Sequence, residues 1–300
     1  MTPTTSKPSE STDSTTIGFL GNNWVPRNQM VISIEDVGFR QGVTAVERLR
    51  TYGQTVFSIE AHLDRWQHST AEMGLSGLPV LSDIEALIHE LLRRNRTFLE
   101  SEKDVGITLF ATPGTLKSGS HTFGLHINRL DFPTIRQRQT SGQPLVITDV
   151  QQPAPQCWPR SIKARSRMHY FLADAAAQRQ DPAASGVLID NDATITETSI
   201  SNIALVKTDG IHSPPRDRVL RGITQAFVEE LARELGIQWK HSAISADDLL
   251  NADEVLLMGT DGGLWFADRV NGKSIRNAHS PVTYPILQRQ FQSRLAIKRA

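Results

Sequence analysis

The chain has 300 residues, of which 39% are hydrophobic and 21% charged, which is enough apolar material to bury one large core or two medium ones. Lysine and arginine number 32, aspartate and glutamate number 32, and the formal net charge is therefore zero. Intrinsic disorder of most of the chain is excluded, and nucleic-acid binding as the main task is disfavoured because no excess positive charge exists to neutralise a phosphate backbone.

Cysteine and histidine usage argues against a disulfide scaffold and against a structural metal. The single cysteine, Cys157, cannot form an internal disulfide, and the nine histidines show no His-Glu-x-x-His spacing. We therefore expect a cytoplasmic protein without a metal.

Residues 1–16, rich in Ser, Thr and Pro, are expected to form a disordered tail and not a signal peptide. No apolar run approaches the roughly 20 residues that span a bilayer, so we expect no membrane segment.

Short apolar runs alternate with helical patterns from Ile17 onward, which predicts a mixed α/β protein. The first half should contain, in order, helix 63–73, a helix from Ser82 to Leu92, strand 105–111 and strand 121–128. Ser82 and Glu85 form a predicted capping box for the second helix. An apolar stripe marks the side of that helix that faces the core: Ile84, Leu87, Ile88, Leu91 and Leu92.

A proline-rich segment separates the two halves of the chain. Its prolines are Pro133, Pro144, Pro153, Pro155 and Pro159. Because proline interrupts helices and central strands, we place the domain boundary in this segment. The expected parts are the tail 1–16, an N-terminal α/β domain 17–140, an interdomain region 141–160 and a C-terminal domain 161–300.

The second half again shows helical and strand patterns. The expected elements are helix 170–178, strand 186–189, a turn at Asn191-Asp192, a β-rich stretch 194–206, helix 224–235, strand 255–258 and helix 282–295. In helix 224–235, Phe227, Leu231 and Leu235 fall on one line, and Thr224 is placed to cap the start.

Two glycine-containing turns are candidate phosphate-binding sites. Gly222-Ile223-Thr224 stands at the start of helix 224–235, where the first turn offers N–H groups and partial positive charge to an anion. Gly259-Thr260 directly follows a predicted buried strand. On these residues alone, an ordinary loop glycine with a threonine cap and an ordinary strand-ending turn are the commoner interpretations.

Three charged side chains have the chemistry of an active site. Lys163 precedes Arg165 and Arg167, whose charges would lower the pKa of its amine and make it a nucleophile towards carbonyls. Glu197 lies in a β-rich stretch of small polar residues, where a carboxylate could keep a heterocyclic nitrogen protonated. Arg65 could pair bidentately with a phosphate. Each is also compatible with an ordinary surface charge.

These signals occur together and in a fixed order along the chain. With this set of motifs in this order, the sequence resembles the class IV pyridoxal-phosphate aminotransferases. That superfamily includes branched-chain and D-amino-acid aminotransferases and aminodeoxychorismate lyase. The resemblance runs from about Ile32 to Phe291, and Thr-Glu-Thr-Ser-Ile-Ser-Asn-Ile at 196–203 is its most specific stretch. It is also carried by residues 36–42, 46–50, 62–65, 220–224 and 258–260, and by Lys163 with Arg167.

The resemblance implies a two-domain α/β (α+β) fold, with a smaller N-terminal α/β domain and a larger, β-rich C-terminal domain with helices. It also implies a homodimer and pyridoxal 5′-phosphate as the cofactor. Lys163 would hold this cofactor as a Schiff base, and Glu197 would face its pyridine nitrogen. The other cofactor-binding residues that the resemblance implies are Arg65, Leu220, Gly222, Ile223, Thr224, Gly259 and Thr260.

The implied activity is transfer of an amino group between an amino acid and a 2-keto acid, with the Lys163 amine moving the Cα proton. The alternatives are a lyase that releases pyruvate from aminodeoxychorismate and, disfavoured by the catalytic set, a non-catalytic binding module. Met168 stands where many transaminases place a tyrosine, and residues 115–121 show no recognisable arginine loop. We therefore expect a non-standard amino donor and low activity with branched-chain donors.

Overall fold

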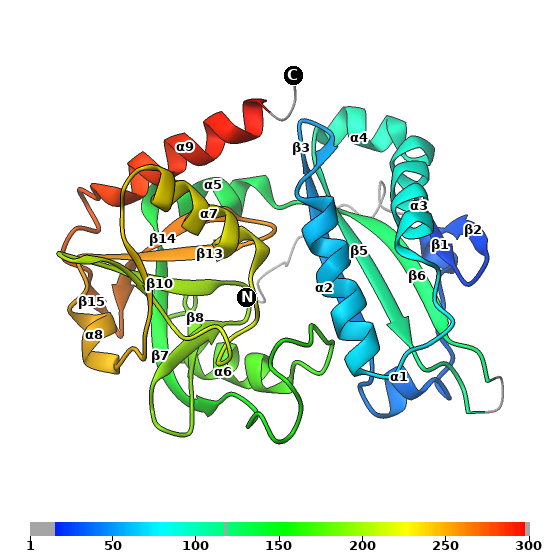
Figure 1. Ribbon diagram of the computed structural model, residues 1–300, viewed down its shortest axis with the longest axis horizontal. Coiled ribbons are helices and arrows are strands. Elements are labelled where there is room, and N and C mark those ends of the chain that lie inside the picture. The colour runs from blue at the N-terminus through cyan, green and yellow to red at the C-terminus, as the bar shows by residue number, and fades with distance from the viewer. Residues whose placement is uncertain (1–15, 117–118, 298–300) are drawn as a thin grey trace, which may run out of the picture. The chain divides into compact units, whose positions relative to one another are not determined.

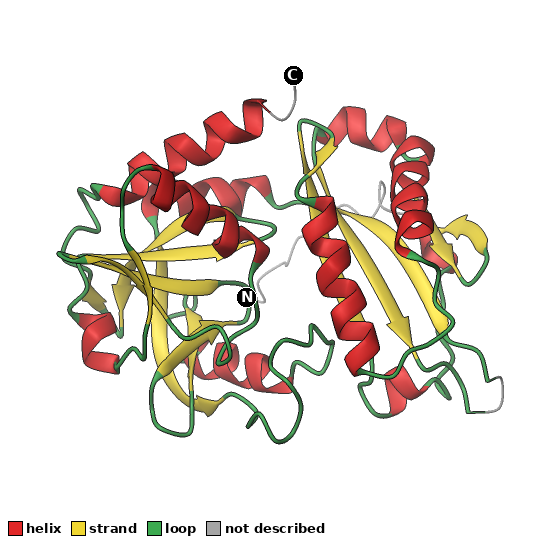
Figure 2. Ribbon diagram, viewed as in Figure 1, coloured by secondary structure: helices red, strands yellow, loops and turns green. Residues whose placement is uncertain are grey.

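The computed structural model describes residues 16–116 and 119–297, which form two compact units (Figures 1 and 2). The first unit comprises the residues up to Leu130 together with Ala164–Ser166, and the second comprises Asp131–Lys163 and the chain from Arg167 onward. The sequence places the boundary across 141–160, whereas the structure divides the chain after Leu130. The segment from Asp131 belongs to the second unit because it supplies a helix and a strand there. Nearly all of the expected tail 1–16 lies outside the described residues.

The first unit is built on an antiparallel sheet in the order β2-β1-β6-β5-β3-β4. Its strands are β1 (Ile17–Leu20), β2 (Asn23–Pro26), β3 (Ala45–Tyr52), β4 (Thr55–Val56), β5 (Val105–Thr112) and β6 (Thr122–Arg129). The expected strands 105–111 and 121–128 are therefore confirmed as the neighbours β5 and β6. They pair in continuous register from Val105 opposite Arg129 to Thr112 opposite Thr122.

Helices α2 and α3 pack against this sheet (Figure 1). The helices of the unit are η2 (Arg27–Gln29), α1 (Val37–Arg40), α2 (Ile59–Glu72), α3 (Leu81–Arg94) and α4 (Arg96–Glu102). Ile84, Ile88 and Leu91 on α3 are fully buried, as the apolar stripe predicts. The predicted capping box is wrong, because the chain is already helical at Leu81 with Val80 as the N-cap, so Ser82 lies inside the first turn.

The second unit contains a closed ring of strands. Its strands are β7 (Gln143–Gln151), β8 (Ser185–Ile189), β9 (Ile195–Thr198), β10 (Asn202–Lys207), β11 (Gly210–Ser213), β12 (Trp239–His241), β13 (Glu254–Gly259), β14 (Gly263–Val270) and β15 (Lys273–Ser274). Strand β9 pairs with both β8 and β10, so β10, β13, β14, β7, β8 and β9 close on one another. The closed ring has a fully buried apolar interior that includes Val187, Leu205 and Leu257.

Helices cover the ring from outside (Figure 2). They are α5 (Phe132–Ser141), α6 (Met168–Gln178), α7 (Ile223–Glu234), α8 (Ala246–Leu250) and α9 (Thr283–Ile297). Helix α6 packs on β7 and β8, while α7 and α9 contact each other and the β13–β14 pair. Expected helices 170–178, 224–235 and 282–295 are thus confirmed as α6, α7 and α9. In the described part of the chain, no helix is long and apolar enough to cross a membrane.

Candidate active site

Three neighbouring strands of the ring place residues 196–203 beside the turn Gly259-Thr260. On β10, Asn202 lies opposite Glu197 of β9 and opposite Met258 of β13. Gly259 follows Met258 as the last residue of β13, and Thr260 comes directly after it. Strand pairing therefore brings Glu197 and Gly259 to the same end of the ring.

Asn202 connects this end of the ring to the start of helix α7. Its amide nitrogen donates to Glu197 Oε2 at 3.1 Å and to the carbonyl of Leu220 at 2.9 Å. A Cβ atom on Gly222 would lie 1.8 Å from the Asn202 Oδ1 atom, so only glycine allows this close approach. One buried asparagine therefore brings together Glu197, Leu220 and Gly222.

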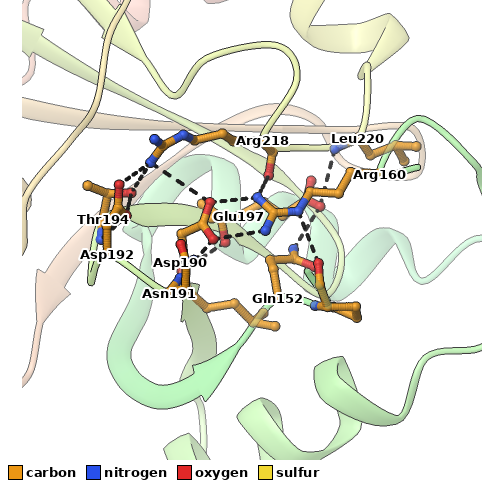
Figure 3. Close-up of polar contacts among 12 residues, drawn as sticks. Gln152, Arg160, Asp190, Asn191, Asp192, Thr194, Glu197, Arg218 and Leu220 are labelled. Atoms are coloured by element: carbon orange, nitrogen blue, oxygen red, sulfur yellow. Dashed lines mark hydrogen bonds and ion pairs between the residues drawn. The ribbon is translucent and has the colours of Figure 1, made fainter. Parts of the chain in front are cut away.

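Glu197 is 4% exposed and accepts hydrogen bonds from four donors. Its Oε1 atom accepts from the Tyr170 hydroxyl at 2.7 Å. The same oxygen accepts from the Gln152 amide at 3.1 Å and from the backbone N–H of Leu220 at 3.3 Å (Figure 3). Among the described residues, the Oε2 atom accepts from Asn202 alone. Because a carboxylate oxygen can accept two or more hydrogen bonds, Oε2 has capacity for one further donor.

Burial is the largest influence on Glu197 and raises the pKa of its carboxyl group above the ordinary value. Hydrogen bonds from Tyr170 and Leu220, and the charges of Lys163 and Arg167, oppose that rise. Burial and the Glu197 charge also raise the pKa of Tyr170 well above 10, so the phenol stays protonated and donates. The result is a buried carboxyl group of high proton affinity, held by fixed donors.

Lys163 lies in the segment between β7 and α6 and is half-buried. Its charge is near enough to Glu197 to lower the pKa of that carboxyl group, so the two groups belong to one electrostatic site. Lys163 is also the last residue before Ala164–Ser166, which are grouped with the first unit. There Ala164 forms a β-bridge with Ala45, and the Arg165 N–H donates to the Thr44 carbonyl at 2.9 Å.

The start of α7 and the end of β13 provide the two predicted glycine positions. Gly222 is the N-cap of α7, so Ile223 and Thr224 form the first helical positions. The prediction that Thr224 caps this helix is therefore wrong; its side chain is buried in the first turn, and Gly222 takes the cap position. A Cβ atom on Gly259 would lie 2.2 Å from the carbonyl oxygen of Ile200, so the backbone needs glycine here too.

Arg65 lies in the first unit, on α2, and is held by a buried carboxylate. Its Nε and Nη2 atoms donate to Glu47 Oε2 and Oε1 at 3.0 and 2.6 Å. His62 Nδ1 lies 2.9 Å from the same Oε1 atom. Burial tends to raise the pKa of Glu47, but Arg65 and His62 together hold it well below its usual range. The guanidinium is therefore fixed in orientation by an ionised partner.

Several site residues were missed by the sequence analysis. The donors Tyr170, Gln152 and Asn202, and the partner Glu47 of Arg65, were not singled out for these roles. Asn202 lies within the specific stretch 196–203, and its position on a strand next to that of Glu197 is the one local signal that could have identified it. Gln152 and Tyr170 lie far from Glu197 in the sequence, so only the fold brings them to it.

Comparison with known proteins identifies the family. The profile described as Amino-transferase class IV matches residues 44–270. A D-alanine aminotransferase of Bacillus licheniformis is 26% identical over 266 residues, which cover 86% of this chain and 89% of that protein. Aminodeoxychorismate lyase of Bacillus subtilis is 24% identical over 254 residues, covering 79% and 80%. The Escherichia coli branched-chain amino acid aminotransferase shares the fold, with a TM-score of 0.86, 19% identity and coverage of 93% and 94%.

The family model spans most of the described residues, and the fold is that of the solved branched-chain aminotransferases. The chain belongs to the class IV aminotransferases, and it is an aminotransferase that uses pyridoxal 5′-phosphate. The structure of a branched-chain aminotransferase from Thermobaculum terrenum in its PLP form matches with a TM-score of 0.82 and 16% identity, covering 95% of each chain.

The residues of the second unit fit this cofactor. Glu197 has a raised proton affinity and capacity for one more donor, which suits a protonated ring nitrogen. The N-terminus of the twelve-residue helix α7, with glycine at its cap, suits a phosphate. The Lys163 amine, which acts electrostatically on Glu197, suits an aldehyde carbon.

Proposed function

We propose that the protein transfers an amino group between an amino acid and a 2-keto acid, and that Lys163 binds the cofactor covalently as a Schiff base. The observation that carries the proposal is Glu197, a buried carboxyl group with four hydrogen-bond donors that also responds to the charge of Lys163. Perturbed acids next to a lysine in a buried site are typical of catalytic sites.

Residues of this chain would bind the cofactor and control the protons during the reaction. Bound pyridoxal phosphate supplies an electron sink for the negative charge that develops at the substrate Cα. The Lys163 Nζ atom would hold the cofactor, and its amine, when free, would accept the substrate Cα proton and later donate that proton to complete the amino transfer. Glu197 would face the ring nitrogen and favour its protonated form, because the charge of a buried carboxylate is little screened by water.

The remaining proposed contacts hold the cofactor in place. The residues assigned to them are Arg65, Leu220, Gly222, Ile223, Thr224, Gly259 and Thr260. Support comes from the glycine positions, where any side chain would clash, and from the start of α7, where N–H groups attract an anion. Arg65 contributes a planar cation whose orientation Glu47 fixes.

Borohydride reduction followed by peptide mapping tests the covalent role. The reagent should fix the cofactor on Lys163, and the Lys163→Arg variant should take up no covalent label. Lys207→Arg is the matched control, because Lys207 pairs with Asp248 at 2.5 Å and should leave the labelling unchanged. Label on Lys207 or Lys240 in the parent would contradict the assignment.

A coupled assay across L- and D-amino acids and aminodeoxychorismate tests the substrate. We expect transamination of a non-standard amino donor, since Met168 is 75% exposed at the start of α6 and offers no polar anchor. Branched-chain transamination with a kcat/KM of about 10⁴ M⁻¹s⁻¹ or more would contradict this expectation. Release of pyruvate without a keto-acid acceptor would instead establish the lyase alternative.

The same proposal includes a homodimer. Its support is the family resemblance, in which the partner's loops complete the active site. Sedimentation velocity at enzyme concentrations used for assay should show a dimer, and a fully active monomer would overturn this part of the proposal.

A further inference from the structure

Arg160, just upstream of Lys163 in the chain, connects three separate segments through one buried guanidinium. Its Nη1 and Nη2 atoms donate to Asp190 Oδ2 and Oδ1 at 2.6 and 2.9 Å. Its Nε atom donates to the carbonyl of Pro153 at 3.1 Å, and Nη1 also donates to the carbonyl of Arg218 at 3.2 Å. Figure 3 shows the guanidinium with its bonds to Asp190 and to the Arg218 carbonyl.

Each acceptor lies next to a part of the chain that holds Glu197. Pro153 directly follows Gln152, whose amide donates to Glu197 Oε1. Arg218 lies in the segment that leads to Leu220, whose N–H donates to the same oxygen. Asp190 begins the turn into β9, the strand that carries Glu197.

The ion pair itself is buried and satisfied. The Arg160 and Asp190 side chains are 5% and 7% exposed, and Asp190 also accepts from the N–H of Asn191 at 2.7 Å. A buried ion pair of this kind is often no more stable than apolar residues of the same volume, so net stability is a weak reason for its presence. Its distinctive property is geometry, because a planar guanidinium directs several donors at fixed angles and a lysine cannot.

We propose that Arg160 is a positioning residue, which fixes the backbone carrying Lys163 relative to the Gln152 and Leu220 segments that hold Glu197. This inference rests on the proposed roles of Lys163 and Glu197. Arg160 acts through the carbonyl groups of Pro153 and Arg218 and through Asp190.

Arg160→Lys separates positioning from charge pairing. A lysine ammonium can still neutralise Asp190, but it cannot serve both carboxylate oxygens and both carbonyls at once. In the cofactor-free variant we expect faster amide hydrogen exchange in residues 153–163 and 218–222, with the unfolding transition close to that of the parent. In the loaded variant we expect at least tenfold weaker cofactor binding and an altered circular dichroism band of the bound cofactor.

Arg218→Gln is the matched control. It removes a guanidinium that faces the same Asp190 at 3.8 Å and Asp192 at 2.6 Å, while the backbone carbonyl that Arg160 uses remains. This variant should keep parental exchange in residues 153–163 and the parental dichroism band. If it instead matches Arg160→Lys in both measurements, any disturbance of the ion pairs of Asp190 explains the effect and positioning by Arg160 is overturned.

The double variant Arg160→Met/Asp190→Asn provides a test should Arg160→Lys fold poorly, because it leaves no unpaired buried charge. Parental exchange and parental cofactor affinity in this variant, or in Arg160→Lys, would overturn the proposal. Failure of the proposed function is recognised separately, since the parent would then not be labelled at Lys163. The exchange measurement on the cofactor-free protein does not depend on that labelling.

Discussion

Two opposing effects act on the pKa of the Glu197 carboxyl group. Burial favours its protonated form, while the hydrogen bonds and the nearby Lys163 and Arg167 charges favour the ionised form, and burial is the stronger. A solvent-exposed glutamate would give its proton to water at neutral pH. A buried glutamate held by directed donors instead attracts a protonated ring nitrogen strongly, because little water screens the pair. Keeping that nitrogen protonated is the function proposed here.

The Tyr170 hydroxyl makes the shortest hydrogen bond to Glu197, so its removal is the most direct test of that balance. In Tyr170→Phe the ionised form of Glu197 loses a donor, and the pKa of Glu197 should rise further. A hydrogen bond to a charged group contributes about 1.5–3 kcal/mol, so we expect kcat to fall roughly ten- to a hundredfold. Steady-state kinetics with the best amino donor, together with the pH dependence of kcat, measures this.

Tyr284→Phe is the control for that variant. The Tyr284 hydroxyl donates to the carbonyl of Gln139 at 2.8 Å, in the same unit but with no contact to Glu197. It should leave kcat and its pH dependence at parental values. Equal kinetics in Tyr170→Phe and the parent would refute a role for Tyr170 in holding Glu197.

Helix α7 begins at a place where the packing excludes a side chain. Gly222 has φ −71° and ψ 124°, which other residues also adopt, so backbone strain does not explain the glycine. The reason is space, because a Cβ atom would overlap the Asn202 Oδ1 atom at 1.8 Å. The first turn of α7 is therefore tied to Glu197 through Asn202.

Gly222→Ala should push the Asn202 amide away from Glu197 and Leu220. We expect cofactor affinity to fall at least tenfold, together with a lower midpoint of thermal unfolding, because the clash strains the folded state. Absorbance titration with pyridoxal phosphate and calorimetry of the cofactor-free protein measure the two effects.

The double variant Gly222→Ala/Asn202→Ala identifies the cause. Removing the Asn202 side chain relieves the clash, so thermal stability should recover in part, while cofactor affinity should stay low because the Asn202 amide is lost. Parental cofactor affinity in Gly222→Ala would rule out the coupling between α7 and Glu197.

At the scale of the whole molecule, acid stability depends on buried ion pairs. In the first unit, Glu47 is fully buried with Arg65, and its pKa in the folded state lies well below the unfolded value of about 4.3. The depressed pKa stabilises the fold fully above the unfolded pKa, and this stabilisation is lost as the pH falls towards the folded pKa.

Glu47→Gln should lower the free energy of unfolding at pH 7 by about 3 kcal/mol, because it leaves the Arg65 charge buried without its ionised partner. Below about pH 4.3 the parent should lose up to about 1.4 kcal/mol per pH unit more than the variant. Urea unfolding at a series of pH values between 3 and 7 measures both. If the free energies of unfolding of parent and variant changed in parallel with pH, the lowered pKa of Glu47 in the folded state would be contradicted.

Glu90→Gln is the matched control for the acid profile. Glu90 pairs with Arg93 and Arg94 on the surface of α3, and these arginines lower its pKa to about 2. Water and salt screen such exposed pairs, so this variant should unfold almost as the parent does at every pH.

Local patterns were sufficient for several elements of the fold, chiefly the longer helices and buried strands. Apolar periodicity predicted α3 and α7, and apolar runs predicted the strands β5 and β6, because these elements depend on residues close together in the sequence. The motif order also pointed to the family and its cofactor. The predicted capping positions of Ser82 and Thr224 were wrong, because the N-cap lies two residues earlier in each helix, at Val80 and at Gly222.

The contacts that make the site were decided by the tertiary structure. Gln152, Tyr170 and Leu220 reach Glu197 only because β9 closes the strand ring and the connecting segments fold over its end. The division after Leu130 is likewise a property of packing, since α5 and β7 join the second unit despite the prolines around them. The sequence by itself determined the family and indicated the residues proposed to carry the chemistry, while their hydrogen-bond partners came from long-range pairing that has no local pattern.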